Sequence, residues 1–430
     1  MKFRYTLLLL CLLQLSYAQE LYFPPATGAW ETTAPEDLGW CEEELTDLQD
    51  FLAERDTKAF IVLKNGRMVL EWYYDDFTQD SIWYWASAGK AMTATLIGIA
   101  QEEGLLSIDD PTSDYLGEGW TQLTPEQEKQ ITIRHQLTMT TGLNDIGVNV
   151  DCTDPACLTY LQEPGTRWAY HNAPYTLLGA VIEAASGLTF NQYLNSRVLS
   201  PIGGFGAYIS LNFNRVLFSR PRDMARFGLM TLANGQWNGT SILGDQEYLT
   251  EMSTPSQDLN PSYGFLWWLN GQESFQQPRL QFNFPGSIIP TAPDDMFAGL
   301  GANDQKVYVV PSEDLVVVRL GDDAGEGLLA LTDFDGLLWE KIMSLECGVT
   351  NTLEAPEAPS LTLAPNPVRD QLQLTTGHAI EWIHLVSLDG RRTVLPNLTQ
   401  LDLTTHPAGI YWLEVKLADS APVVRKVVVQ

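Results

Sequence analysis

The sequence predicts an α/β (α+β) fold, in which helices flank an antiparallel sheet, followed by a small C-terminal all-β sandwich. Before residue 349, strand-like patterns gather near both ends of the segment, with mainly helical patterns between them. After residue 360 the pattern changes to short alternating strands separated by turns. We therefore expect a large domain whose sheet is built from both of its ends, with a helical lobe inserted between them.

The large domain begins with a helix and a hairpin. Residues 42–52 have a helical pattern, while residues 59–63 and 68–74 are rich in apolar, β-branched and aromatic residues. Asn65-Gly66 lies between these two runs, and Asn-Gly in that position is typical of a hairpin turn. Further helical patterns occur at residues 131–143, 165–187, 219–235 and 328–345. Further strand-like runs occur at residues 263–269, 305–310 and 315–320.

The C-terminal part differs in composition and in pattern. Residues 349–360 read as a linker, because Pro, Ala and Glu dominate and no apolar period is present. Short strands are then expected at residues 371–375, 382–388, 400–403, 410–417 and 423–429. Asp389-Gly390 and Ala408-Gly409 mark turns between them, so residues 361–430 predict a small sandwich.

Composition and charge exclude several classes of partner. The chain has 430 residues, of which 45% are hydrophobic and 18% charged, as in globular proteins. Its net charge of −29 argues against binding to nucleic acid or to anionic membrane surfaces. No segment after the N-terminal leader is long and apolar enough for a transmembrane helix.

The N-terminus reads as a signal peptide of residues 1–18. Lys2 and Arg4 form a basic start, residues 6–15 form an apolar core, and Ala18 ends a small-residue cleavage site. The rest of the chain is then expected outside the cytoplasm, secreted or attached to the cell surface. Four cysteines remain, and an even count in an exported chain permits disulfides between Cys152 and Cys157 and between Cys41 and Cys347.

A candidate nucleophile lies at the start of an apolar helical pattern. Ser87 and Lys90 form a Ser-x-x-Lys motif, and one helical turn separates them, so both side chains can project from one face. Backbone N–H groups at a helix start favour a developing negative charge. This arrangement would supply an attacking oxygen, an amine to take its proton and donors for an oxyanion. A chance motif with a capping serine is the plain alternative.

Tyr170 and Asn172 are the candidate partners of this pair. A tyrosine near a cationic lysine is expected to have a lowered pKa and could relay protons, while an asparagine amide can bind the lysine and a substrate carbonyl. The alternative is ordinary packing for Tyr170 and a helix cap for Asn172. No Gly-x-Ser-x-Gly elbow surrounds Ser87, which argues against a Ser-His-Asp hydrolase.

Three tryptophans flank these motif residues. Trp83 and Trp85 lie just before Ser87, and Trp168 lies just before Tyr170. They could line an apolar pocket for an acyl group, or they could simply pack in the core.

Together these motifs resemble those of the serine β-lactamase and penicillin-binding-protein family, on its class C β-lactamase, esterase and 6-aminohexanoate-dimer hydrolase side. Ser87-x-x-Lys90 matches the first family motif and Tyr170-x-Asn172 the second. The segments GLLSIDDPTSDYL, ITIRHQLTMTTGL, PGTRWAYHNAPYTLLGAVIE and RDMARFGLMTLANG also look like that family, in the expected order. The resemblance covers residues 40–346 and implies a β-lactamase-like fold with Ser87, Lys90, Tyr170 and Asn172 as catalytic residues.

The third family motif departs from the usual Lys-Thr-Gly. Its counterpart is Gly299-Leu300-Gly301, followed by Ala302, so the cation that would hold a β-lactam carboxylate is missing from this segment. A cation from elsewhere in the chain could replace it. By resemblance, the backbone N–H groups of Ser87 and Ala302 would form the oxyanion hole.

The C-terminal residues 361–430 resemble a type IX secretion sorting domain. The resemblance is carried by Ala364-Pro365-Asn366-Pro367, Leu388-Asp389-Gly390-Arg391 and Ala408-Gly409-Ile410-Tyr411. Such domains address a protein to export machinery and are commonly removed. The alternative is a β-sandwich that binds carbohydrate or another surface.

The sequence thus predicts an exported serine hydrolase of residues 19–348 that cleaves an ester or a small amide through a Ser87 acyl-enzyme. No metal and no organic cofactor is expected. A true β-lactamase or a D-Ala peptidase, acting on a β-lactam or a peptide, is the alternative among enzymes. A non-catalytic surface binding protein is the alternative of another class.

Overall fold

The computed structural model describes residues 21–324, 332–347, 361–387, 391–418 and 422–430. The expected signal peptide and linker lie outside these residues. The described helices include none that is long and apolar enough to cross a membrane.

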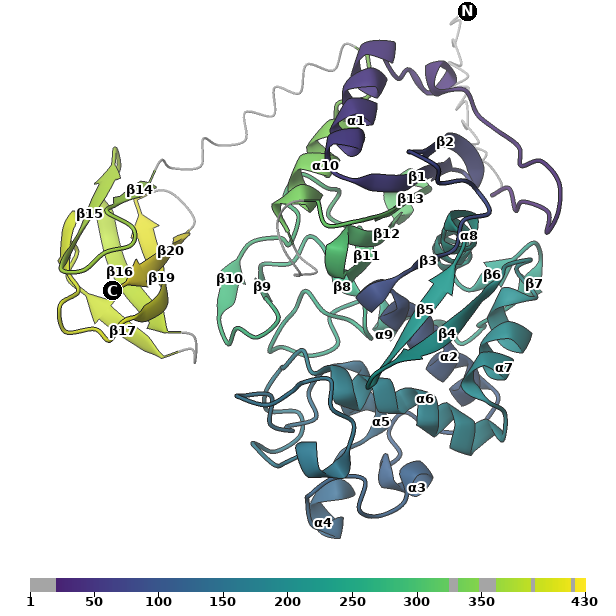
Figure 1. Cartoon of the computed structure of the whole chain (residues 1–430), viewed down its shortest axis with the longest axis horizontal. Coiled ribbons are helices and arrows are strands. Elements are labelled where there is room, and N and C mark those ends of the chain that lie inside the picture. The colour runs from purple at the N-terminus through teal and green to yellow at the C-terminus, as the bar shows by residue number, and fades with distance from the viewer. Residues whose placement is uncertain (1–20, 325–331, 348–360, 388–390, 419–421) are drawn as a thin grey trace, which may run out of the picture.

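The large domain is built on a six-stranded antiparallel sheet (Figure 1). In spatial order its strands are β2 (Arg67–Tyr73), β1 (Thr57–Lys64), β13 (Leu315–Gly321), β12 (Gln305–Val310), β11 (Phe297–Gly301) and β8 (Trp268–Leu269). β1 pairs with β13, with Ile61 opposite Val318, so segments from both ends of the domain meet at the centre of the sheet. This confirms the predicted fold class.

Helices cover both faces of this sheet. Neighbouring strand residues point to opposite faces. Val307 of β12 faces Gly228 of α8 (Pro221–Leu232), whereas the adjacent Tyr308 contacts Trp339 of α10 (Asp333–Met343). α1 (Glu42–Glu54) packs beside α10, and a disulfide joins Cys41, just before α1, to Cys347, after α10. β13 is therefore buried along its whole length.

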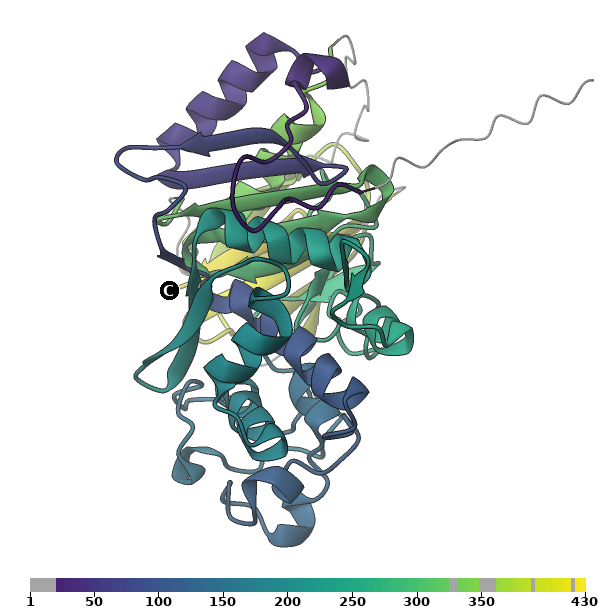
Figure 2. The same cartoon turned by 90° about the vertical axis from the view of Figure 1, so that its right-hand side faces the viewer.

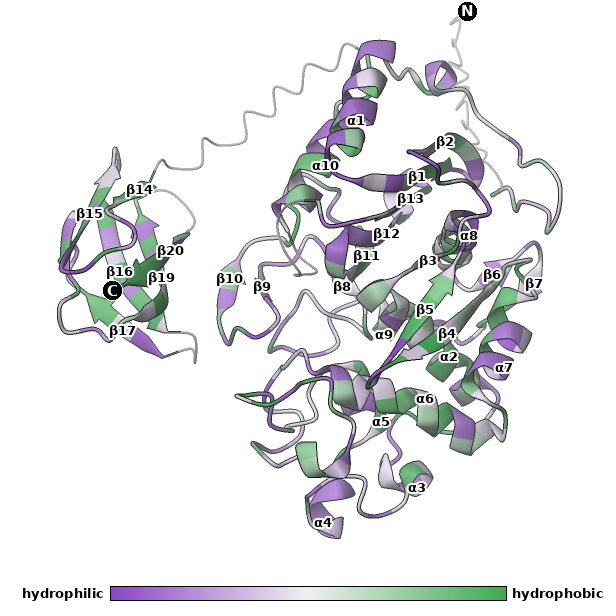
Figure 3. Cartoon of the chain, viewed as in Figure 1, coloured by the Kyte–Doolittle hydropathy of each residue, from purple (hydrophilic) through white to green (hydrophobic). Residues whose placement is uncertain are grey.

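The inserted lobe is mainly helical and lies below the sheet in Figure 2. Its helices are α2 (Gly89–Glu102), α3 (Ser113–Leu116), α4 (Pro125–Glu128), α5 (Ile133–Leu137), α6 (Asn172–Ser186), α7 (Phe190–Leu194) and α9 (Gln246–Met252). α2 packs against α6, and both are coloured mainly as hydrophobic in Figure 3, in contrast to α1. The first twelve residues of α2, from Gly89 to Ala100, are all buried, which places this helix at the centre of the domain.

Two expected elements are shorter than their patterns suggested. The helix expected at residues 131–143 ends at Leu137, because Met139 and Gly142 have left-handed backbone angles, with φ of 58° and 74°. The strand expected at residues 263–269 is confined to β8, because Leu266 has φ of 60° and a turn joins the Gly264 amide to the Trp267 carbonyl. Apolar composition alone did not reveal these turns.

The C-terminal strands form two sheets that share a core separate from that of the large domain. One sheet has the order β14 (Leu361–Ala364), β15 (Gln371–Thr376) and β18 (Gln400–Asp402). The other has the order β17 (Arg392–Leu395), β16 (Ile380–Ser387), β19 (Gly409–Leu417) and β20 (Val423–Val429). We call these strands the C-terminal sandwich. β14 and β17 were not anticipated from the sequence.

Three short sheets complete the arrangement of the described residues. β3 (Trp83–Tyr84), β5 (Asn214–Ser219) and β4 (Gly206–Leu211) form one, and β3 leads directly to Ser87. β9 (Ser274–Gln276) and β10 (Asn283–Pro285) form a hairpin that lies between the large domain and the C-terminal sandwich (Figure 1). A further pair, β6 (Gln236–Trp237) and β7 (Thr240–Ser241), follows α8.

Candidate active site

Ser87 lies in a tight turn at the junction of the sheet and the lobe. The turn is a single 3-10 segment, Ala86–Ala88, which continues directly into α2. Ala86 has φ of 46°, a left-handed conformation that is costly for a residue with a side chain. Such strain persists only where the surroundings enforce it, and it often accompanies functional sites.

The side-chain nitrogen of Lys90 contacts the Ser87 hydroxyl. The distance from Lys90 Nζ to Ser87 Oγ is 3.0 Å, so the one-turn spacing brings the two groups together as expected. The Lys90 side chain is only 3% exposed and lies 5.0 Å from the ring centre of Tyr170 and 4.3 Å from that of Tyr175. Burial lowers the pKa of Lys90 to about 7, while the Asp151 carboxylate acts in the opposite direction. A substantial fraction of neutral amine is therefore present near pH 7.

Tyr170 completes an aromatic wall beside this pair. Its ring stacks on Trp268 with centroids 6.0 Å apart and also contacts Trp168 and Tyr263. Burial raises the pKa of Tyr170, and a hydrogen bond with Ser87 only partly opposes that rise. The sequence-based expectation of a lowered pKa was wrong, because desolvation outweighs the field of a lysine that is itself readily neutral. Tyr170 therefore keeps its phenolic proton.

Asn172 is the first residue of α6, and its amide points to an acidic partner. Its Nδ2 donates to Asp151 Oδ1 at 2.7 Å, while its buried Oδ1 has no hydrogen-bond partner within the described parts of the chain. The cap position of α6 belongs to His171, so Asn172 is not a helix cap. An unpaired buried carbonyl oxygen is available to accept from a ligand or a nearby amine.

Asp151 is the site residue that sequence reasoning missed. It binds Asn172 and acts electrostatically on Lys90, although 61 positions separate it from the lysine. It immediately precedes Cys152, which forms a disulfide with Cys157, and the neighbouring Val150 carbonyl accepts from the Ala173 amide at 2.8 Å. No local motif marks Asp151, since only folding brings this loop to the start of α6.

The Gly299-Leu300-Gly301 segment, the expected counterpart of the third family motif, runs along the Ser87 turn. A Cβ atom on Gly301 would lie 2.5 Å from the Trp85 carbonyl oxygen and 3.1 Å from the Ser87 nitrogen. A side chain therefore cannot fit here, and the two backbones touch. Ala302 follows Gly301 directly and starts a short 3-10 segment, Ala302–Asp304, that contacts the Ala86–Ala88 turn.

Lys306 is the cation nearest in sequence to this segment, but it is locked in the core. Its side chain is fully buried, with Nζ 3.1 Å from Asp304 Oδ1 and 2.9 Å from Asp335 Oδ2. It therefore faces α10 and cannot bind a substrate carboxylate.

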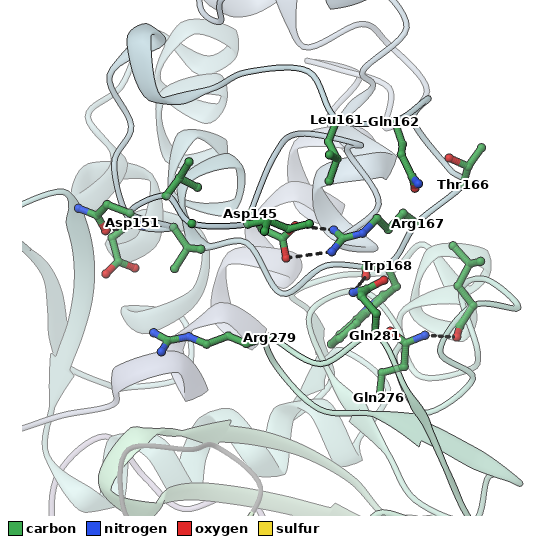
Figure 4. Close-up of a pocket in the computed structure, with 16 residues that line it drawn as sticks. Asp145, Asp151, Leu161, Gln162, Thr166, Arg167, Trp168, Gln276, Arg279 and Gln281 are labelled. Carbon is green, nitrogen blue, oxygen red and sulfur yellow. Dashed lines mark hydrogen bonds and ion pairs between the residues drawn. The ribbon is translucent and has the colours of Figure 1, made fainter. Parts of the chain in front are cut away.

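A cavity of about 790 Å³ lies beside the site (Figure 4). Asp151 and Trp168 form the part of its lining that adjoins Lys90 and Tyr170; Ser87 itself is outside the lining. Arg167 is paired with Asp145 in this wall, whereas Arg279 has no dashed contact to the other residues drawn. Arg279 is thus an exposed cation in the wall of the cavity.

The three tryptophans have different positions. Trp168 is 1% exposed and belongs to the main apolar core, and it also adjoins the cavity. Trp85 is fully buried and donates to Ser219 Oγ at 2.7 Å, so it packs in the core. Trp83 is partly buried and donates to the Gly321 carbonyl at 3.2 Å, away from the cavity lining.

Comparisons with known proteins agree with this geometry. The family model described as Beta-lactamase matches residues 48–333, more than half of the chain. The chain is 22% identical over 321 residues to the 6-aminohexanoate-dimer hydrolase of Paenarthrobacter ureafaciens, which spans 64% of this chain and 75% of that protein. It is 31% identical over 158 residues to the beta-lactamase of Escherichia coli (strain K12), spanning 34% of this chain and 41% of that protein.

A solved structure shares the fold. The putative beta-lactamase from Bacteroides dorei DSM 17855 superposes with a TM-score of 0.56 at 20% identity, covering 74% of this chain and 99% of that chain. The family match extends over the sheet, the lobe and the Ser87 turn. The chain therefore belongs to the Beta-lactamase family, whose members are serine hydrolases.

Proposed function

We propose that this chain is an exported serine hydrolase that cleaves an ester or a small amide through an acyl-enzyme on Ser87. The observation that carries the proposal is the 3.0 Å contact between Ser87 Oγ and a buried Lys90 whose pKa lies at about 7. A hydroxyl nucleophile needs an adjacent base that is neutral at the working pH, and this lysine meets that need.

In the proposed reaction, the neutral Lys90 amine takes the proton of Ser87 as Oγ attacks the substrate carbonyl. The backbone N–H groups of Ser87 and Ala302 hold the resulting oxyanion. Tyr170, which retains its phenolic proton, donates it to the leaving group and regains one from the Lys90 ammonium. Water then attacks the acyl-enzyme, the acid leaves, and the water proton returns to Ser87 through the same groups. Asn172 is held in place by its hydrogen bond to Asp151 and orients the substrate carbonyl.

Esters and small amides rank first because Gly299–Gly301 carries no cation and Lys306 is committed to two carboxylates. The relative named 6-aminohexanoate-dimer hydrolase also points to small amides. β-Lactam hydrolysis or D-Ala peptide cleavage is the second candidate. It is favoured by Arg279, an exposed guanidinium in the cavity wall that could bind a substrate carboxylate.

A substrate panel tests this ranking. Initial rates would be measured for a short-chain aryl ester, a small linear amide, a D-Ala-D-Ala peptide and a cephalosporin. We expect the ester to react fastest, with an acyl adduct visible on the intact protein by mass spectrometry. A cephalosporin that turns over faster than the ester would reverse the ranking.

Arg279→Gln separates the two candidates further. Loss of the guanidinium should raise KM by about tenfold for a substrate with a carboxylate near the scissile bond, because a charge-assisted contact contributes about 1.5–3 kcal/mol. The KM of a neutral ester should change by less than about twofold. The measurement is a matched pair of substrates, one acid and its methyl ester; equal changes for both would contradict a role for Arg279 in carboxylate binding.

The rate should rise with pH through about 7 and then level off. Only the neutral amine accepts a proton, and burial lowers the pKa of Lys90 to about 7. Burial also lowers the pKa of His171 to about 4, so this neighbour is already neutral across the window. The measurement is kcat/KM from about pH 5 to pH 9, a range that spans the titration of Lys90.

Asp151→Asn tests whether Lys90 is the group that titrates in this profile. The Asp151 carboxylate raises the pKa of Lys90 against the effect of burial, so its removal should move the midpoint to lower pH. A profile that is flat, or that moves to higher pH in this variant, would exclude Lys90 as the titrating base.

Export is proposed on the leader at residues 1–18 and on the resemblance of residues 361–430 to a type IX sorting domain. The protein recovered from the cell surface or medium should begin at Gln19, because the small-residue site ends at Ala18. N-terminal sequencing and intact mass would check both ends. A cytoplasmic chain that still begins at Met1 would contradict export.

A further inference from the structure

The β9–β10 hairpin connects the cavity to the C-terminal sandwich. On one side, Gln276, Arg279 and Gln281 line the cavity (Figure 4). On the other side, Phe282 and Phe284 belong to an apolar cluster that includes residues of the C-terminal sandwich. The same short hairpin therefore forms a wall of the pocket and a contact between two separately packed parts of the chain.

The contact with the C-terminal sandwich is aromatic and well buried. Phe284 packs edge-to-face on Trp412 of β19, with ring centroids 5.3 Å apart and planes at 85°. Phe282 and Phe284 are only 4% and 8% exposed, and Val386 of β16 is fully buried in the same cluster. The Arg392 guanidinium lies 5.7 Å from the ring centre of Phe282.

The sequence of the C-terminal sandwich also fits this contact. Side chains alternate along a strand, and Leu413 and Val415 of β19 point into the sandwich core. The intervening Trp412 points outward, beside Val386 on the neighbouring strand β16. An outer sandwich face that met only water would expose this apolar pair, so the hairpin supplies its cover.

The other side of the hairpin is hydrogen-bonded to residues that line the cavity. Gln281 Nε2 donates to the Trp168 carbonyl at 2.8 Å, and Trp168 lies two positions before Tyr170. Gln276 Nε2 donates to Asn283 Oδ1 at 2.7 Å and to the Leu259 carbonyl at 3.0 Å, which joins the two strands to the cavity rim. The hairpin is thus hydrogen-bonded to Trp168 and Leu259, which both line the cavity.

We propose that the C-terminal sandwich holds the β9–β10 hairpin in place and so sets how the cavity binds substrate. A two-stranded hairpin is marginally stable by itself and needs packing to keep one conformation. Release of the C-terminal sandwich would expose Phe282 and Phe284 and allow the wall that carries Arg279 and Gln281 to move. The effect on substrate binding rests on the proposed hydrolase function, whereas the docking itself does not.

The test uses the full-length chain with Trp412→Ala, which removes the ring that contacts Phe284. Trypsin cleavage after Arg279 reports on the hairpin, because proteolysis requires local unfolding of the cleaved segment. We expect cleavage at least fivefold faster than in the wild type. KM for a bulky ester should change at least threefold, with kcat for a small acetyl ester altered by less than twofold.

Val394→Ala is the matched control. Val394 lies on β17 of the same sheet and is 74% exposed, outside the aromatic cluster, so neither readout should change. Phe284→Ala removes the partner ring from the hairpin side, and the double variant with Trp412→Ala should cleave no faster than the faster single variant, because both remove one contact.

The two readouts keep the proposals separate. If Trp412→Ala unfolds the C-terminal sandwich, as circular dichroism would reveal, the hairpin loses its cover and the same acceleration is expected. Cleavage at Arg279 and KM equal to those of Val394→Ala would overturn the docking proposal. Faster cleavage of Trp412→Ala than of the wild type, together with no ester hydrolysis by either, would instead keep the docking and reject the hydrolase function.

Discussion

Ser87→Ala should lower the rate of ester hydrolysis by about 10⁴–10⁶-fold, the loss typical of removing a catalytic serine. The substitution deletes the oxygen that forms the acyl bond. The fold should be unaffected, because the lost contacts are those with the Lys90 and Tyr170 side chains, and the turn around Ser87 is held by backbone packing against Gly301.

The measurement combines turnover with covalent labelling. The wild type, exposed to a fluorophosphonate, should gain one adduct in its intact mass, and Ser87→Ala should gain none. Ser81→Ala is the control, because Ser81 lies in the turn before β3 and its hydroxyl accepts from the Thr78 amide rather than from a lysine. An unchanged rate in Ser87→Ala would refute the mechanism. A folded wild type that takes no label and turns over no ester would favour a surface binding protein.

Lys90→Met should reduce kcat by about 10²–10⁴-fold, the range over which a positioned base contributes. Methionine retains an apolar stem of similar length, so it fills the space between the rings of Tyr170 and Tyr175. The buried amine is costly to desolvate and no ion pair to it is found within the described residues, so its removal should leave the melting temperature unchanged or raise it.

The control is a lysine that is equally buried but paired. Lys306→Met would leave Asp304 and Asp335 without their shared cation, so unfolding should become easier by about 3–5 kcal/mol. Thermal melts and ester kinetics would be measured for both variants. A Lys90→Met protein that melts lower than wild type but retains full kcat would show that Lys90 supports the fold and not the reaction.

The sequence predicted the elements whose signals are local. The hairpin around Asn65-Gly66 and the strands β12 and β13 follow from their own residues and turn. The contact of Ser87 with Lys90 follows from the pitch of one helical turn, which needs no knowledge of the rest of the chain. The two disulfides were permitted by an even cysteine count, and the structure contains both pairs.

Other features depended on parts of the chain that meet only after folding. Asp151 reaches Asn172 from a loop with no motif, so no pattern in the sequence identified it. The pKa of Tyr170 was expected to be lowered, yet burial raises it, because desolvation depends on everything that surrounds a group. Trp85 and Trp168 are both tryptophans beside a motif residue, so the sequence does not distinguish them. In the structure Trp85 packs in the core, whereas Trp168 also lines the cavity.

The sequence by itself determined the fold class, the family motifs and the pairing of Ser87 with Lys90. These rest on spacing along one helix or strand, where neighbours in sequence are neighbours in space. Only the tertiary structure decided the protonation of the site, the cation of the cavity wall and the contact of Phe284 with Trp412. Each of these depends on the solvent that folding removes and on side chains that folding brings together, because electrostatic and apolar energies follow distance and burial.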